Sequence, residues 1–129
     1  MQYFDEINGC KYIYLSNLEE PQDNSLRLVV EEAITETSSV VINVGGIEMA
    51  GSRGISVIED SQVYEIVFET YIGYSVIDES FALPDNEEVF DGRLFCVYEK
   101  SGYLDYLKKS SFACDDHPGP FKHLSLIHI

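Results

Sequence analysis

Alternation of apolar and polar residues dominates this chain and predicts short β-strands. It is clearest at Tyr64, Ile66 and Phe68, which share one face of an extended chain. Glu65 and Glu69 fall on the opposite face. Alternating or continuously apolar runs predict strands over 11–18, 26–30, 40–44, 55–58, 63–77 and 93–99, with 63–77 forming two tightly joined strands or one long bent strand. We therefore expect about six to eight strands.

One segment near the C-terminus has a helical pattern instead. Ser101 is suited to the N-cap position because its side-chain oxygen can accept a hydrogen bond from a backbone N–H of the first turn. Tyr103, Leu104 and Leu107 then share one helical face. The sequence predicts one short helix near residues 101–110, and a helix of this length must be held by packing across the sheet.

These elements predict an α+β, mainly β fold: a twisted antiparallel sheet or a partly closed barrel with one C-terminal helix. A chain of 129 residues has the size of one domain, and we assign residues 1–123 to it. Residues 124–129 can alternate as a strand, but they also look like the translation of a sequencing adapter. We therefore expect native sequence to end near His123, with a final strand missing or replaced.

The charge of the chain narrows the range of partners. Its 23 acidic and eight basic side chains give a net charge of −15, and residues 1–99 alone carry 20 acids and four bases. Nucleic acid is not an expected partner, because non-specific affinity for it comes from Lys and Arg on phosphates. Anionic membranes are disfavoured for the same reason. A basic protein partner is favoured, because opposite charges steer association.

The sequence predicts a cytoplasmic protein. Its N-terminus shows neither the basic region nor the apolar region of a secretory signal, and no apolar run is long enough to span a bilayer. Cys10, Cys96 and Cys114 are odd in number and lack CxxC spacing, which is typical of reduced thiols. The sequence predicts no particular oligomeric state.

Cys114, His117 and His123 form the cluster with the most metal-like chemistry. Cysteine and histidine are transition-metal ligands, but a structural zinc site needs a second ligand pair that this chain lacks. Cys114 precedes Asp115 and follows the predicted helix, so neither a cation nor a helix N-terminus activates it as a nucleophile. We expect no metal, no cofactor and no catalytic residue, and place Cys114 in the interior beside a polar turn.

The candidate binding residues combine tyrosine with carboxylates. Tyrosine is enriched in protein interfaces, and carboxylates attract a basic partner. The residues predicted to bind are Glu65, Glu69, Tyr71, Tyr74, Asp78 and Glu79. A solvated strand face would show the same pattern without any binding role.

Three stretches carry a resemblance to known proteins: residues 24–33, 64–81 and 103–121. Together they resemble a family of small, acidic, largely uncharacterised bacterial proteins, similar to the immunity proteins of polymorphic toxin systems. The resemblance implies a binding module that neutralises a basic toxin through an acidic surface, and a further apolar strand after residues 118–120, where this chain departs. Two alternatives stay open: a small enzyme or ligand-binding protein with a Tyr/carboxylate cleft, and an acidic domain with no separable activity.

Overall fold

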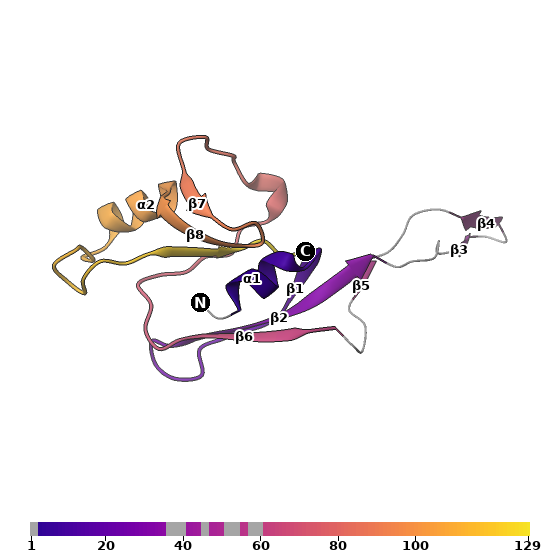
Figure 1. Cartoon of the computed structure of the whole chain (residues 1–129), viewed down its shortest axis with the longest axis horizontal. Coiled ribbons are helices and arrows are strands. Elements are labelled where there is room, and N and C mark those ends of the chain that lie inside the picture. Colours follow the sequence, from indigo (N-terminus) through magenta and orange to yellow (C-terminus); the bar gives the residue numbers. More distant parts are fainter. Residues whose placement is uncertain (1–2, 36–40, 45–46, 51–54, 57–60) are drawn as a thin grey trace.

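Antiparallel strands are the main regular elements of the structure (Figure 1). The computed structural model describes residues 3–35, 41–44, 47–50, 55–56 and 61–129. The first sheet contains β1 (Tyr12–Glu19), β2 (Leu26–Thr35) and β6 (Val63–Phe68), with β2 in the centre. The second contains β7 (Val89–Asp91), β8 (Phe95–Lys100) and β9 (His123–Leu126), with β8 in the centre. The predicted α+β, mainly β class is confirmed.

The remaining strands are short. Strand β5 (Ile55–Ser56) pairs with the end of β2, and β3 (Val41–Val44) pairs with β4 (Ile47–Ala50) as a hairpin. Strand β4 was not predicted, and residues 40 and 57–58 of the predicted strands lie outside the described part of the chain. Over that described part the strands form separate antiparallel sheets and no closed barrel, and the predicted twisted sheet or partly closed barrel stays a prediction.

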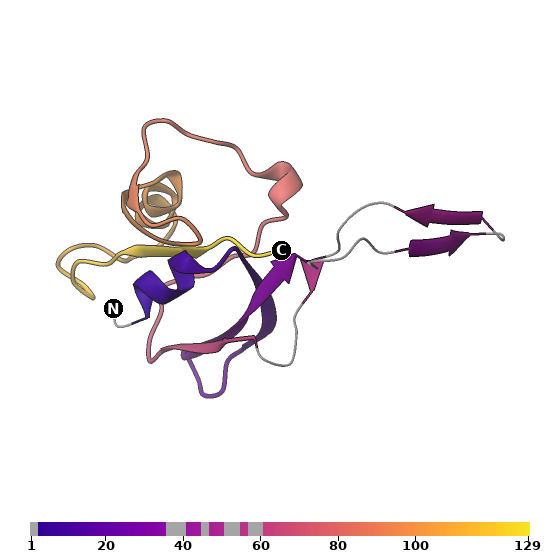
Figure 2. The ribbon, with the colours of Figure 1, turned by 45° about the vertical axis from the view of Figure 1, so that its right-hand side comes forward.

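The predicted C-terminal helix is present as α2 (Gly102–Ser110). Its first turn is capped as expected, since the Ser101 hydroxyl accepts a hydrogen bond from the Leu104 N–H at 3.1 Å. Two further helical segments were not predicted, α1 (Phe4–Gly9) and the 3₁₀ turn η1 (Glu79–Phe81). Helix α1 lies between the two sheets (Figure 2), so tertiary packing holds this six-residue helix in place of a side-chain cap, which it lacks.

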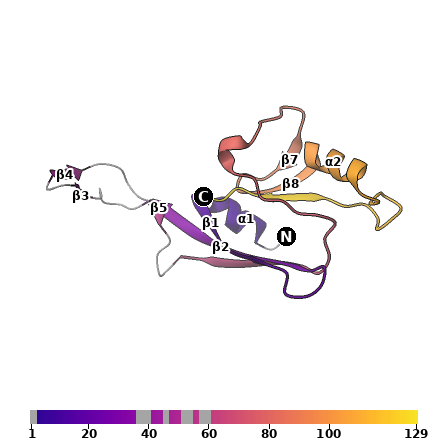
Figure 3. The same cartoon turned by 180° about the vertical axis from the view of Figure 1, so that it is seen from behind.

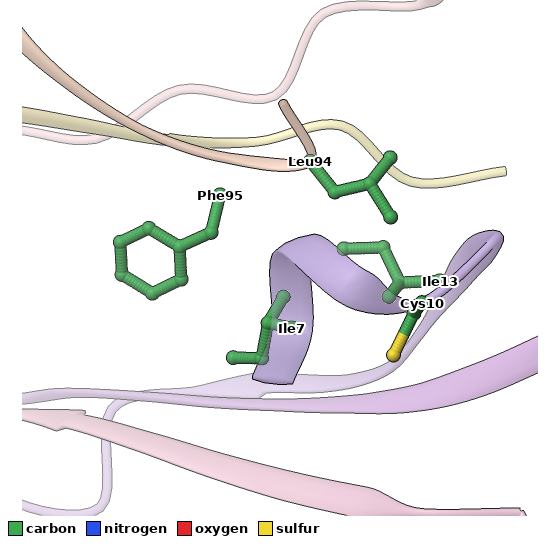
Figure 4. Close-up of a cluster of buried hydrophobic side chains, with 5 residues drawn as sticks. All are labelled: Ile7, Cys10, Ile13, Leu94 and Phe95. Carbon is green, nitrogen blue, oxygen red and sulfur yellow. The ribbon is translucent and has the colours of Figure 1, made fainter. Parts of the chain in front are cut away.

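The core brings α1 together with one strand of each sheet. Five buried side chains form its centre (Figure 4): Ile7, Cys10, Ile13, Leu94 and Phe95. Partly buried side chains of β6, β8 and β9 pack around them, among them Tyr64, Ile66, Val97, Leu124 and Leu126. The inward positions of the alternating strand β6 therefore lie against the core, as the alternation predicted.

Asn8 joins α1 to the start of β8 through its side-chain amide. Its Oδ1 accepts hydrogen bonds from the backbone N–H groups of Arg93, Leu94 and Phe95 at 2.7, 2.8 and 3.0 Å. Its Nδ2 donates to the carbonyls of Phe4 and Phe95, each at 3.0 Å. One partly buried side chain therefore accepts from three consecutive backbone N–H groups of one segment and donates to two backbone carbonyls.

The segment after β6 differs from its prediction. Residues 71–77 are not a strand: most of their side chains are exposed, and the chain runs irregularly until β7, which the sequence did not predict. Tyr71 and Tyr74 pack against each other, with ring centroids 5.3 Å apart. Tyrosine and β-branched residues are typical of strands, but among the described residues no strand pairs with residues 71–77.

Residues 123–129 are integrated into the fold. Strand β9 pairs antiparallel with β8, with Leu124 opposite Val97. Beyond it, the Ile127 N–H donates to the Leu94 carbonyl at 2.8 Å, and the Ile129 N–H donates to the Ile13 carbonyl at 2.9 Å. The domain limit at residue 123 and the adapter origin of residues 124–129 stay predictions.

Candidate functional site

Five of the six predicted binding residues lie on one irregular segment between β6 and β7. We call residues 69–88 the acidic loop, and it contains Glu69, Tyr71, Tyr74, Asp78 and Glu79. It also includes Asp85, Glu87 and Glu88, and it contains no Lys or Arg. The loop leads from the end of β6 through η1 to β7 (Figure 1).

Both ends of the acidic loop are held by α2. At one end, a Cβ atom added to Gly73 would lie 3.2 Å from the Leu107 Cδ2 atom, so any side chain here would crowd Leu107. At the other end, the Gly102 N–H donates to Glu88 Oε2 at 3.0 Å. A carboxylate at this position also interacts favourably with the helix dipole. The loop is therefore fixed at its ends to one face of the molecule.

Two aspartates order the interior of the acidic loop. Asp78 Oδ1 accepts a hydrogen bond from the Ser80 N–H at 2.8 Å and begins η1. Asp85 Oδ1 accepts from the Glu87 N–H at 2.9 Å. Asp78 therefore serves the loop's own backbone, while Glu79 lies beside it in η1.

The acidic loop exposes several large apolar side chains. Phe81 and Leu83 are 78% and 89% exposed, and Val76, Ile77 and Tyr74 are also exposed. Single exposed apolar residues are ordinary on protein surfaces. Five of them lie within residues 74–83, and contiguous exposed apolar patches are the usual candidates for interaction sites. Of these five residues, only Tyr74 was predicted from the sequence. The available signal for the other four was a stretch without Lys or Arg in which apolar residues lie beside carboxylates and Pro84.

Glu65, the sixth predicted binding residue, lies outside the acidic loop. It lies on β6, where its Oε2 accepts from Arg27 Nε at 2.9 Å. Arg27 also donates through Nη1 to Glu19 Oε1 at 2.9 Å. The hydrogen bond that Arg27 donates to Glu65, followed by the one it donates to Glu19, raises the pKa of Arg27 above its ordinary value. Strand pairing thus places a cation beside Glu65 that local sequence did not indicate.

The three residues with the most metal-like chemistry, for which no metal was expected, lie in two separate places. Cys114 and His117 face each other across one turn, with the Cys114 N–H donating to the His117 carbonyl at 2.8 Å. Cys114 is exposed and not interior as expected. His123 lies in β9 with its Nδ1 2.8 Å from Ser101 Oγ. Within the described residues, no group of three or more His, Cys, Asp or Glu side chains is arranged to hold a metal ion.

His123 is held in an aromatic setting. The Tyr98 ring stacks on it at 4.4 Å between centroids, and the Tyr103 ring meets it edge-on at 5.1 Å. Burial lowers the pKa of His123, and the nearby Glu88 opposes this in part. Because Ser101 Oγ already accepts from the Leu104 N–H, its own proton is free to donate to a neutral His123. The contacts of His123 with Ser101 and Tyr103 therefore join β9 to the start of α2.

A small cleft offers little to an enzymatic alternative. Its cavity volume is about 220 Å³, and it is lined by Lys11, Tyr12, Glu79, Arg93 and residues 127–129 among others. Pockets for drug-sized ligands span about 300–1,000 Å³. Arg93 is already committed to the backbone carbonyls of Asn8 and Cys10. The cleft therefore places Tyr12 near the Glu79 carboxylate, and one of its two cations, Arg93, serves the fold.

The buried polar groups beside the core are held in protonated form. Burial, followed by the charge of Glu32, raises the pKa of the Cys10 thiol. Burial also raises the pKa of Tyr64 to about 12. A raised pKa disfavours the thiolate and the phenolate, which are the nucleophilic forms of these groups.

No family model, curated protein or solved structure matches this chain. The resemblance to immunity proteins therefore stays a prediction. Within the described residues, no helix is long and apolar enough to cross a membrane. The surface with the most distinctive chemistry is the acidic loop.

Proposed function

We propose that this chain is a protein-binding module whose acidic loop docks a basic partner protein, in the manner of an immunity protein that neutralises a basic toxin. The observation that carries the proposal is the exposure of Phe81 and Leu83 within a loop that contains no cation. The proposed setting is the cytoplasm, in keeping with the free state of all three cysteines.

The two kinds of side chain in the loop have different parts in binding. Apolar residues that enter a partner's pocket supply most of the affinity of a typical interface. Carboxylates mainly speed association and select a partner of opposite charge. Residues 54–92 contain ten acids and no Lys or Arg, so a partner approaching the loop meets an uninterrupted negative stretch of sequence.

The loop also defines the surface that it fits. A suitable partner has an apolar hollow for Phe81 and Leu83, surrounded by Lys or Arg that face carboxylates such as Glu79 and Glu87. Because α2 holds both ends of the loop, less of the binding free energy is lost to ordering than in a free segment. A second copy of this chain is a poor partner, since each copy carries a charge of −15.

Calorimetric titration tests the proposal with purified basic proteins encoded by the genes adjacent to this one. We expect one of them to bind, with affinity that falls as salt is raised. The double variant Phe81→Ser/Leu83→Ser is expected to weaken binding about 30-fold, as loss of a roughly 2 kcal/mol anchor requires. The matched control is Phe112→Ser, because Phe112 is fully exposed but follows Lys108 and Lys109.

Two results would overturn the proposal. One is binding that the Phe112→Ser control weakens as much as the double variant does. The other is the absence of binding by every basic protein of the neighbourhood. Circular dichroism on each variant checks that the fold is retained, which is expected because all three side chains are exposed.

A further inference from the structure

Strand β6 is an edge of the first sheet, and β2 is its partner within the described residues (Figures 1 and 3). The Glu32 N–H donates to the Gln62 carbonyl at 2.8 Å, just before β6 begins. The same register continues along the pair, from Glu31 opposite Val63 to Leu26 opposite Phe68. This places every residue of β6 in a defined position of the antiparallel ladder.

The register decides which backbone groups are free for another strand. In an antiparallel pair, hydrogen-bonded and non-hydrogen-bonded positions alternate. Because the pair at Gln62 is hydrogen-bonded, the even-numbered residues of β6 bond to β2. The N–H and C=O groups of Val63, Glu65 and Val67 therefore point toward the open edge, where the described residues provide no partner strand.

This edge lacks the protection that other edges of the structure have. Strand β1 has an irregular register between Leu15 and Asn17, and the three-residue β7 has one between Val89 and Phe90. Strand β9 has only four residues. Strand β6 pairs regularly over six residues and contains no Pro, Lys or Arg. Proteins usually guard open edges with such residues, bulges or short strands.

The exposed side chains of β6 indicate which side chains an added strand should carry. Val63, Glu65 and Val67 alternate as exposed positions, so two apolar groups flank one carboxylate. Glu65 shares Arg27 with Glu19, which leaves this ion-paired group with a net charge of −1. Glu69 follows in the same alternation and is exposed. A strand that alternates apolar and cationic side chains complements this edge, whereas a second acidic copy does not.

We propose that β6 is a strand-addition site, at which a basic β-strand of a partner protein hydrogen-bonds to Val63, Glu65 and Val67. The positive charge of the partner rests on the proposed function. The mode of binding does not, since it uses the backbone of β6 and not the apolar side chains of the acidic loop. In this proposal Glu65 contacts the partner, although it lies outside the acidic loop.

Hydrogen exchange of backbone amides, followed by NMR on the full chain, tests the site. The probe is a synthetic eight-residue peptide of alternating lysine and valine. We expect the amides of Val63, Glu65 and Val67 to exchange rapidly in the free protein and at least tenfold more slowly with saturating peptide. The amides of Tyr64 and Ile66 should be slow in both states. The same peptide with every backbone nitrogen methylated should not bind, because neither edge can then donate hydrogen bonds to β6.

A pair of lysine variants separates this site from the acidic loop. Val67→Lys places a cation at the edge and is expected to weaken peptide binding at least tenfold. Val76→Lys places one in the acidic loop at a similarly exposed valine and is expected to have little effect. Thermal unfolding confirms that both variants fold.

Either of the following results overturns the strand-addition proposal. If the peptide fails to bind, or binds without slowing the three edge amides, β6 is not the site. If Val76→Lys weakens peptide binding and Val67→Lys does not, the peptide binds the acidic loop, which contradicts strand addition and agrees with the proposed function. The Phe81→Ser/Leu83→Ser experiment tests that function separately, so failure of the two ideas is distinguishable.

Discussion

Replacing Asn8 with alanine removes five hydrogen bonds that join α1 to the start of β8. Three are accepted by Oδ1 from backbone N–H groups and two are donated by Nδ2 to carbonyls. A protein hydrogen bond contributes about 1 kcal/mol net, and an unsatisfied buried group costs about 1–3 kcal/mol. Because water can reach part of this site, we expect Asn8→Ala to lower the free energy of unfolding by about 3 kcal/mol.

That loss is large enough to measure by heat or denaturant. An unfolding entropy of about 2.1 cal/mol/K per residue gives about 0.27 kcal/mol/K for 129 residues. A loss of about 3 kcal/mol therefore lowers the midpoint of thermal unfolding by about 11 °C. Urea titration gives the same quantity as a lower midpoint with an unchanged slope.

Two further variants show whether the acceptor oxygen is what matters. Asn8→Asp keeps an oxygen for the three N–H groups but cannot donate to the carbonyls of Phe4 and Phe95, so we expect an intermediate loss of about 1–2 kcal/mol. The exposed Asn86→Ala is the matched control and should change stability by less than about 0.5 kcal/mol. The reasoning fails if Asn8→Ala is as mild as Asn86→Ala.

Three other predictions concern the rest of the fold. Burial keeps the pKa of His123 below its ordinary 6.5, so the unfolded chain binds the proton more readily than the folded chain. Urea unfolding should therefore show the free energy of unfolding falling as pH drops below about 6.5, and falling less steeply in His123→Gln. The same pH dependence in both proteins would contradict this. Gly92 and Gly119 both have positive φ, but only at Gly92 would a Cβ meet backbone, 1.9 Å from the Phe95 carbonyl oxygen. Thermal melts should show Gly119→Ala losing about 1 kcal/mol and Gly92→Ala at least about 3 kcal/mol, and equal losses would refute the clash. Deleting residues 124–129 should lower the melting temperature, because strand β9 contributes to the core; an unchanged melt would support their non-native origin.

Much of the secondary structure follows from local sequence. The alternation around Tyr64 and Phe68 predicts β6, and the chemistry of Ser101 predicts the first turn of α2. Both depend on neighbours within a few residues, so they can be read from the chain directly. The charge of −15 is likewise a property of composition alone, and it limits the kind of partner whatever fold the chain adopts.

The tertiary structure decided the features that depend on distant residues. Helix α1 is short and uncapped, and it exists because Ile7 enters the core and Asn8 binds the start of β8, 85 or more positions away. The same holds for the acidic loop: residues 71–77 have the composition of a strand but find no strand partner, and α2 holds both ends of the loop. Sequence therefore determined which residues alternate and which charges they carry. Only packing decided that Glu65 lies at a sheet edge beside Arg27, while Tyr74 and Asp78 lie on the acidic loop. The reason is that strand pairing and burial are set by contacts between segments far apart in the chain.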